Sequence, residues 1–171
     1  METVVMNYFK KLIQTLTKEK DVLESILKLE NEKYEILRNV DIKGLMEINS
    51  QEEGLLEMID TVEKKRKEII FYLCKEYNLD RNLSLKEIVS ILKEEIGEEI
   101  EKEISSLREN IKNVSENLKA AVRENEALIK SNLEIISLTL NLTGKHSFYE
   151  TYNHKSKGDS FSKVHIVNSL A

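Results

Sequence analysis

The chain has 171 residues, of which one third are charged, with no Pro, no Trp and only five Gly. This composition is typical of long helices with a large exposed surface and excludes a compact α/β enzyme. The single Cys excludes an internal disulfide framework and favours a reducing compartment. No window approaches the roughly 18 apolar residues that a membrane span needs. We therefore expect a soluble, cytoplasmic protein that does not insert into a membrane.

The net charge of −5 is unevenly distributed. Residues 143–171 contain four Lys against Glu150 and Asp159, a charge of +2, so residues 1–142 carry −7. Binding to phosphates needs clustered positive charge, and an acidic body therefore argues against nucleic acid as the main partner.

Two helical tracts come first in the chain. Apolar residues recur three and four positions apart over residues 9–37 and again over 45–73, with Asp41 as the N-cap of the second tract. The segment between them (39–44, "NVDIKG") is a weak break, so the tracts form either one kinked helix or an antiparallel pair. We favour the pair, because neither tract can cover its apolar stripe alone.

Two charged residues interrupt the apolar stripe of the second tract. Glu52 and Arg66 lie two heptads apart, too far to pair along one helix. We expect each to meet a charge on a facing helix and to fix the register of packing, although direct contact with a ligand is the alternative.

A short helix and a long one follow. Residues 77–83 are predicted to form a loop, and Ser84 and Glu87 have the spacing of a capping box that opens a short helix. Gly97 then breaks the chain before a helix over 98–142, about 65–70 Å long at 1.5 Å per residue. The predicted fold is all-α: an elongated antiparallel helical bundle or coiled coil over 1–142, with a short helix between long helices, and a flexible C-terminal tail over 143–171.

The last long helix changes character near its end. Its apolar residues form a narrow stripe over 100–121, but over 128–142 they spread around most of the circumference, while the stripe itself turns polar at Asn125, Asn132 and Thr139. Such a helix is either buried in the centre of the bundle or covered by a partner chain, identical or not.

No residues suggest catalysis. His146, His154 and His165 lack the spacing of a helical metal site, and no Gly-rich phosphate loop is present. Cys74 has no His close in sequence and is predicted to be a structural thiol. We expect a binding protein without a catalytic site, metal or cofactor.

The chain resembles FlgN-type flagellar export chaperones. The resemblance rests on the second tract "DIKGLMEINSQEEGLLEMIDTVEKKRKEII", the short helix "SLKEIVSIL", the Asn-bearing last helix "RENEALIKSNLEIISLTLNLTG" and the tail "YETYNHKSKG". The tail differs from the family pattern in the longer spacing between Tyr152 and Gly158. The resemblance implies a cytoplasmic chaperone that binds terminal helical segments of hook–filament junction proteins and presents them to the cytoplasmic domain of the export-gate membrane protein.

These expectations assign residues to two binding sites. The tail has too little apolar bulk to form a core, but its aromatic residues can anchor it on a partner. We therefore expect Tyr149 and Tyr152 to bind the export gate, with a merely disordered end as the alternative. The residues expected to bind cargo are Asn125, Leu128, Ile129, Asn132, Leu133, Ile135, Ile136, Thr139 and Leu140.

A structural coiled-coil protein that forms homo-oligomers without cargo is the alternative function. A spacer needs a uniform apolar stripe, whereas this one widens over 128–142, which favours the chaperone. A helical-bundle enzyme is disfavoured because the chain lacks the Glu-x-x-His spacing of di-iron bundles.

Overall fold

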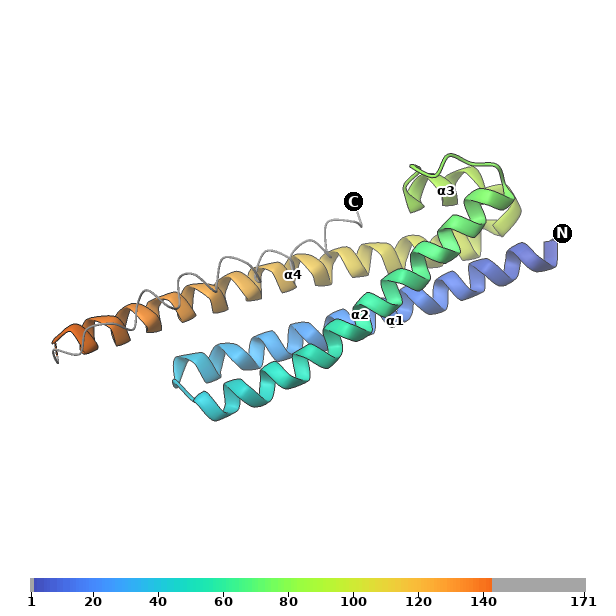
Figure 1. Cartoon of the computed structure of the whole chain (residues 1–171). Coiled ribbons are helices and arrows are strands. Elements are labelled where there is room, and N and C mark those ends of the chain that lie inside the picture. The colour runs from blue at the N-terminus through green and yellow to red at the C-terminus, as the bar shows by residue number, and fades with distance from the viewer. Residues whose placement is uncertain (1, 143–171) are drawn as a thin grey trace.

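The protein consists of three long helices and one short one (Figure 1). The computed structural model describes residues 2–142, and side chains within 5–140. The helices are α1 (Glu2–Arg38), α2 (Ile42–Glu76), α3 (Leu85–Ile91) and α4 (Lys93–Leu142). The predicted elongated all-α fold, with a short helix between long ones, is confirmed. The predicted tail lies outside the described residues.

The helices α1 and α2 form the antiparallel hairpin that the sequence favours (Figure 1). Asp41 caps α2 as predicted, because its Oδ1 accepts a hydrogen bond from the backbone N–H of Gly44 at 3.1 Å. A Cβ added to Gly44 would lie 2.6 Å from the Asp41 carboxylate, so a side chain at this position would displace the capping group.

Buried ion pairs fix the register of the hairpin. Arg66 Nε lies 3.0 Å from Glu19 Oε2, and Glu52 Oε2 lies 2.6 Å from Lys33 Nζ. A step of 14 residues forward along α1 is matched by 14 residues backward along α2, as antiparallel packing requires. The prediction that Glu52 and Arg66 each meet a charge on a facing helix is confirmed.

The two local signals before α4 are also confirmed. The hydroxyl of Ser84 accepts from the N–H of Glu87 at 3.3 Å, and the Glu87 carboxylate accepts from the N–H of Ser84 at 2.7 Å, which completes the capping box. Gly97 has a φ of 82° and a ψ of 159°, outside the helical region. It separates the first turn of α4 from the long helix that follows.

The helix α4 runs parallel to α1. Asn125 contacts Glu30, and seven residues further along both helices Asn132 contacts Leu37, so both pairs are separated by 95 positions in the chain. The helix α1 thus packs along both α2 and α4, which meet each other only marginally. The last residue of α1, Arg38, corresponds to residue 133 of α4. The remainder of α4, residues 134–142, therefore continues past the end of α1 (Figure 1).

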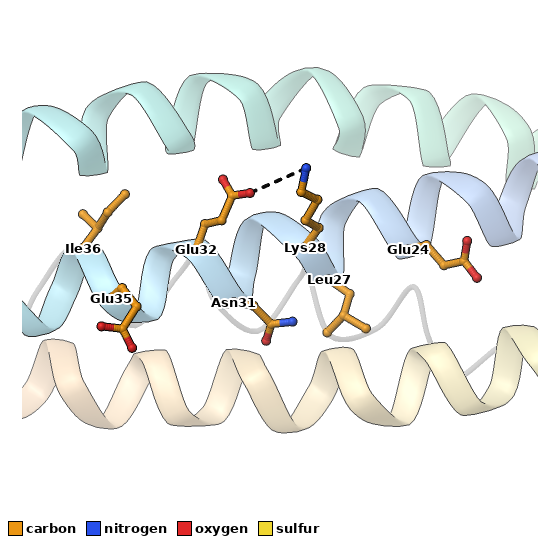
Figure 2. Close-up of a pocket in the computed structure, with 7 residues that line it drawn as sticks. All are labelled: Glu24, Leu27, Lys28, Asn31, Glu32, Glu35 and Ile36. Atoms are coloured by element: carbon orange, nitrogen blue, oxygen red, sulfur yellow. Dashed lines mark ion pairs between the residues drawn. The ribbon is translucent and has the colours of Figure 1, made fainter.

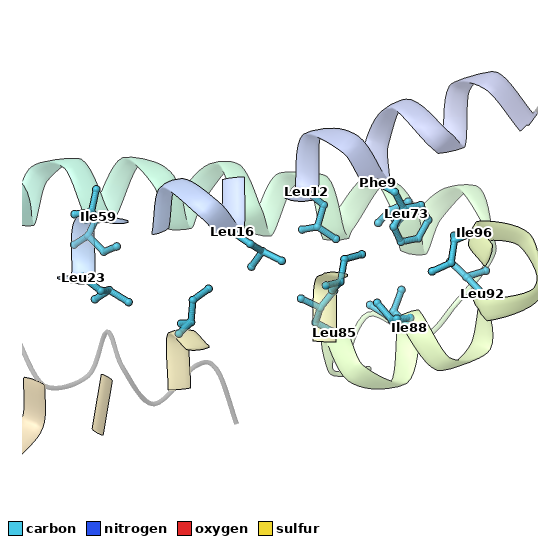
Figure 3. Close-up of a cluster of buried hydrophobic side chains, with 14 of the residues drawn as sticks. Phe9, Leu12, Leu16, Leu23, Ile59, Leu73, Leu85, Ile88, Leu92 and Ile96 are labelled. Atoms are coloured by element: carbon cyan, nitrogen blue, oxygen red, sulfur yellow. The ribbon is translucent and has the colours of Figure 1, made fainter. Parts of the chain in front are cut away.

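The apolar core is largest where all four helices meet. Figure 3 shows α3 and the start of α4 closing over α1 and α2 at this end of the molecule. Fully buried side chains here are Phe9, Leu12, Leu73, Ile88 and Ile104. A narrower row of buried residues continues from this core toward the hairpin turn.

Candidate functional site

The end of α4 exposes apolar side chains. Exposed fractions are 59% for Ile135, 48% for Ile136 and 63% for Leu138, and Ile129 is exposed as well. Leu128, Leu133 and Leu140 are half-buried. We call these seven residues the α4 apolar surface. Because the exposed members cannot belong to a bundle interior, the interpretation that this segment is buried in the centre is wrong.

The predicted cargo-binding residues divide into two groups. Asn125 and Asn132 face α1: Asn125 is buried and its Nδ2 donates to the backbone oxygen of Glu30 at 2.7 Å, while Asn132 Nδ2 donates to the backbone oxygen of Leu37 at 3.0 Å. Thr139 is exposed and its hydroxyl donates to the backbone oxygen of Ile135 at 2.9 Å. The structure therefore brings the two asparagines to the α1 interface and leaves the apolar residues accessible.

The hairpin turn adds exposed apolar residues that the sequence analysis did not select. Val40, Ile42 and Met46 are 55%, 62% and 69% exposed. The contact between Asn132 and Leu37 places the turn beside the start of the α4 extension. Val40 has a φ of 53°, a left-handed conformation that a β-branched residue adopts only under strain. Nothing in its neighbourhood in the sequence indicates this conformation.

A buried polar cluster lies just inside this end and connects the three long helices. Lys33 Nζ of α1 contacts Glu30 Oε1 at 2.9 Å and Glu52 Oε2 of α2 at 2.6 Å, and Asn125 Nδ2 of α4 donates to Glu30 Oε2 at 2.6 Å. Burial, and then the neighbouring Glu30, raise the pKa of Glu52. Burial also acts to raise the pKa of Glu30, but hydrogen bonds with Glu52, Asn125 and Lys33 outweigh it and lower that pKa. The ammonium group of Lys33 therefore contacts two carboxylates, and the pKa of Glu52 is raised whereas that of Glu30 is lowered.

A shallow groove of about 600 Å³ runs along α1. Figure 2 shows its lining between α2 and α4, with Lys28 paired to Glu32 at 3.8 Å. Leu27 and Ile36 are its only apolar residues, and the others are Glu24, Lys28, Asn31, Glu32 and Glu35. A groove this open cannot enclose a small molecule.

Neither a metal centre nor a reactive thiol is found among the described residues. Within residues 2–142 no group of three His, Cys, Asp or Glu side chains could hold a metal ion. Burial, and then the charge of Asp80, raise the pKa of the Cys74 thiol, so the reactive thiolate is disfavoured. No helix in this part of the chain has both the length and the apolarity to span a membrane. Tyr149 and Tyr152, predicted to bind the export gate, lie outside the described residues.

Comparison with protein families matches the model described as "FlgN protein" over residues 1–158. No curated protein and no solved structure matches the chain. The family match spans the hairpin, α3, α4 and the first part of the segment that follows. The chain therefore belongs to the FlgN family, a family of flagellar export chaperones.

Proposed function

We propose that this protein is a cytoplasmic flagellar type III export chaperone that binds terminal helical segments of hook–filament junction proteins. We further propose that it delivers them to the cytoplasmic domain of the export-gate membrane protein. Membership of the FlgN family supports the general role. The observation that carries the specific proposal is the α4 apolar surface, which α1 leaves uncovered beyond Arg38.

The geometry suits a partner that supplies the missing helix. Along its first part α4 buries one side against α1, but beyond residue 133 no long helix of the described structure accompanies it. An amphipathic helix from the cargo can occupy this place and bury Ile135, Ile136 and Leu138 by apolar anchors three and four residues apart. Val40, Ile42 and Met46 at the hairpin turn are exposed apolar residues near the start of this extension.

The asparagines have a different role in this proposal. Asn125 and Asn132 are held by hydrogen bonds to α1, so they position α4 and set the residue at which its extension begins. The apolar residues then contact the cargo. The positioning of α4 is therefore separable from cargo binding by mutation.

The test compares a variant of the exposed residues with a matched control. Changing Ile129, Ile135 and Ile136 to Ser should leave far-UV helicity unchanged, because all three are exposed. Loss of a single apolar hot spot costs about 2 kcal/mol, roughly thirtyfold in affinity, so the variant should bind a junction-protein terminal peptide at least that much more weakly. Ile91→Ser, an exposed position on α3, is the control and should bind like the unmodified protein.

Two results would contradict the proposal. Unchanged peptide affinity of the triple variant would place the cargo elsewhere. A concentration-dependent dimer that the same variant converts to monomer, with no peptide binding by either, would assign the surface to a second copy of the chain and favour the homo-oligomeric scaffold. A parallel titration of Tyr149→Ala/Tyr152→Ala with the export-gate domain tests the second partner, and equal gate affinity would remove the tyrosines from the proposal.

A further inference from the structure

A second exposed apolar area lies at the other end of the bundle, where α1 and α2 meet the core around α3 (Figure 1). The rings of Tyr8 and Tyr72 stack with centroids 5.8 Å apart, and the ring of Phe71 meets Tyr72 edge-on at 5.9 Å. Phe71 is 42% exposed and Tyr72 is 49% exposed. Three aromatic rings from two helices therefore form one continuous strip at the surface.

Both ends of this strip carry a cation. Lys11 Nζ lies 5.7 Å from the centroid of the Tyr8 ring, and the guanidinium of Arg81 lies 4.8 Å from that of Phe71. Within residues 5–140 neither cation forms an ion pair with a carboxylate. Their charges are held over the rings by cation–π attraction and remain available to an anion. We call Lys11, Tyr8, Tyr72, Phe71 and Arg81 the aromatic strip.

The surroundings of the strip are positive in an otherwise acidic body. The exposed charged residues of 64–81 are Lys64, Lys65, Lys67, Lys75 and Arg81 against Glu68, Glu76 and Asp80, an excess of two cations. Residues 1–142 as a whole carry −7. Lys64 and Lys75 lie seven residues before and four residues after Phe71, and Glu68 lies three residues before it, so two lysines and one carboxylate share its side of α2. Positive charge is thus concentrated around the exposed aromatic rings.

From these observations we infer that the aromatic strip is a second protein-binding site, whose partner is an acidic amphipathic segment with apolar anchors. The anchors pack on Phe71 and Tyr72, and flanking carboxylates meet Lys11 and Arg81. Rigid aromatic side chains and Arg are the residues that most often dominate binding energy at protein interfaces. The charge of the strip gives such a partner its specificity and accelerates its association.

An anionic membrane is the other surface that aromatic and basic residues suit. The acidic body opposes it, because a bilayer would also face the negatively charged surface beyond the strip, and residues 1–142 as a whole carry −7. A discrete acidic segment avoids most of this repulsion, since it needs to contact only the strip. The inference does not depend on the cargo role of α4, because the two surfaces lie at opposite ends of the molecule (Figure 1).

The test uses the full chain and two designed helical peptides of about 18 residues, or five turns. Both carry Leu and Phe anchors on one side, and the other positions are Glu in the acidic peptide and Lys in the basic one. Fluorescence anisotropy should show the unmodified protein binding the acidic peptide at least about tenfold more tightly than the basic one. Lys11→Glu/Arg81→Glu should reverse this preference, because it replaces the two cations of the strip by carboxylates. Both residues lie at the surface, so the fold should be kept.

Further variants separate the rings from the charges. Phe71→Ser/Tyr72→Ser should weaken binding of the acidic peptide about tenfold or more, and Tyr72→Phe should restore most of the affinity lost by Tyr72→Ser. Ile135→Ser/Leu138→Ser, at the far end of α4, is the matched control and should bind the acidic peptide normally.

Four outcomes would overturn the inference. These are equal affinity for the two peptides, loss of binding in the α4 control, and an unchanged preference after charge reversal. The fourth is association with vesicles of anionic lipid that the charge-reversed protein loses, which would assign the strip to a membrane. Helicity measured by circular dichroism accompanies each variant, and if the Ser variants unfold, the charge-reversed protein alone decides the question.

Discussion

Asn125 shows how one polar side chain can set the packing of a long helix. It occupies a position where the apolar stripe of α4 calls for Leu or Ile, and its Nδ2 reaches both the backbone and the carboxylate of Glu30. A shift of α4 along α1 by anything other than a whole heptad would take this amide away from both Glu30 oxygens and leave buried polar atoms without partners. Asn125 therefore makes the protein less stable than an apolar residue at this position would, but it defines how α4 is aligned with α1.

Removing this amide should destabilise the protein. Asn125→Ala removes the donor to the buried Glu30 Oε2 and one donor to the Glu30 backbone oxygen, and a buried group left unsatisfied costs about 1–3 kcal/mol. Urea unfolding followed by circular dichroism measures this change in the free energy of unfolding. Asn117→Ala, at an exposed position of the same helix, is the control and should change stability by less than about 0.5 kcal/mol. Equal effects of the two substitutions would show that the buried contacts contribute nothing.

The Glu30–Lys33–Glu52 cluster should make stability depend on pH. Burial and the neighbouring Glu30 raise the pKa of Glu52, so the folded protein holds this proton more tightly than the unfolded chain does. Its stabilising contribution is complete below the unfolded pKa and is lost as the pH rises through the folded pKa. The lowered pKa of Glu30 has the opposite sign: its contribution is present above the unfolded pKa and is lost on acidification.

Glu52→Gln isolates the first of these effects. The Gln amide keeps an oxygen that accepts a hydrogen bond from Lys33, but the amide cannot ionise. Between about pH 5 and about pH 8 the melting temperature of the variant should therefore fall less than that of the unmodified protein. The buried Glu19, whose pKa is raised by burial against the opposing charge of Arg66, remains in both proteins and cancels in the comparison. Glu53→Gln, an exposed neighbour, is the control. Parallel curves for the variant and the unmodified protein would contradict the assignment.

At the scale of elements, Gly97 determines where the long helix begins. Its φ of 82° lies in the region that favours glycine, and a Cβ there would meet no atom within 4 Å. The cost of Gly97→Ala is therefore conformational and should be about 1–3 kcal/mol. Gly54→Ala is the matched substitution, because Gly54 lies inside α2 with equally open surroundings, and it should stabilise the protein by up to about 1 kcal/mol. Thermal melts of the two variants should therefore shift in opposite directions, and a shift of the same sign would contradict the role of Gly97.

The elements themselves could be predicted from short stretches of sequence. Asp41, the Ser84–Glu87 capping box and Gly97 act on their immediate neighbours. The helix ends that they determine can therefore be predicted without knowledge of the tertiary structure. The helix that packs against α4 could not be predicted in this way. An apolar stripe shows that a helix packs against another element, but it does not show which element that is. The two asparagines were grouped with cargo-binding residues for this reason, although they contact α1.

The aromatic strip was missed for a related reason. Tyr8 and Tyr72 are far apart in the chain and become neighbours only through the register of the hairpin. That register depends on buried pairs such as Glu19–Arg66, whose partners cannot be matched from the sequence of either helix alone. The strained turn at Val40 also has no local signal, since Val is among the residues least suited to a positive φ.

At the scale of the whole molecule, residues 1–142 should fold without the segment that follows. Within the residues that the structure describes, one apolar core already joins all four helices. A protein ending at Thr143 should therefore melt within a few degrees of the full chain and keep its affinity for the junction-protein peptide. Differential scanning calorimetry of the two proteins measures this, and a large drop in melting temperature would mean that residues 144–171 are part of the folded domain.

The parallel pairing of α1 with α4 also has a consequence in time. Contacting residues of these helices are separated by 95 positions, so each part of α1 meets its partner on α4 only after 95 further residues have been synthesised. At about 5–20 residues per second this takes roughly 5–20 s, far longer than a helical hairpin needs to form. The α1–α2 hairpin therefore forms first, while the chain is still on the ribosome. During this interval the side of α1 that later packs against α4 is exposed to solvent. Completion of the protein is thus a late docking step, whose speed is set by translation.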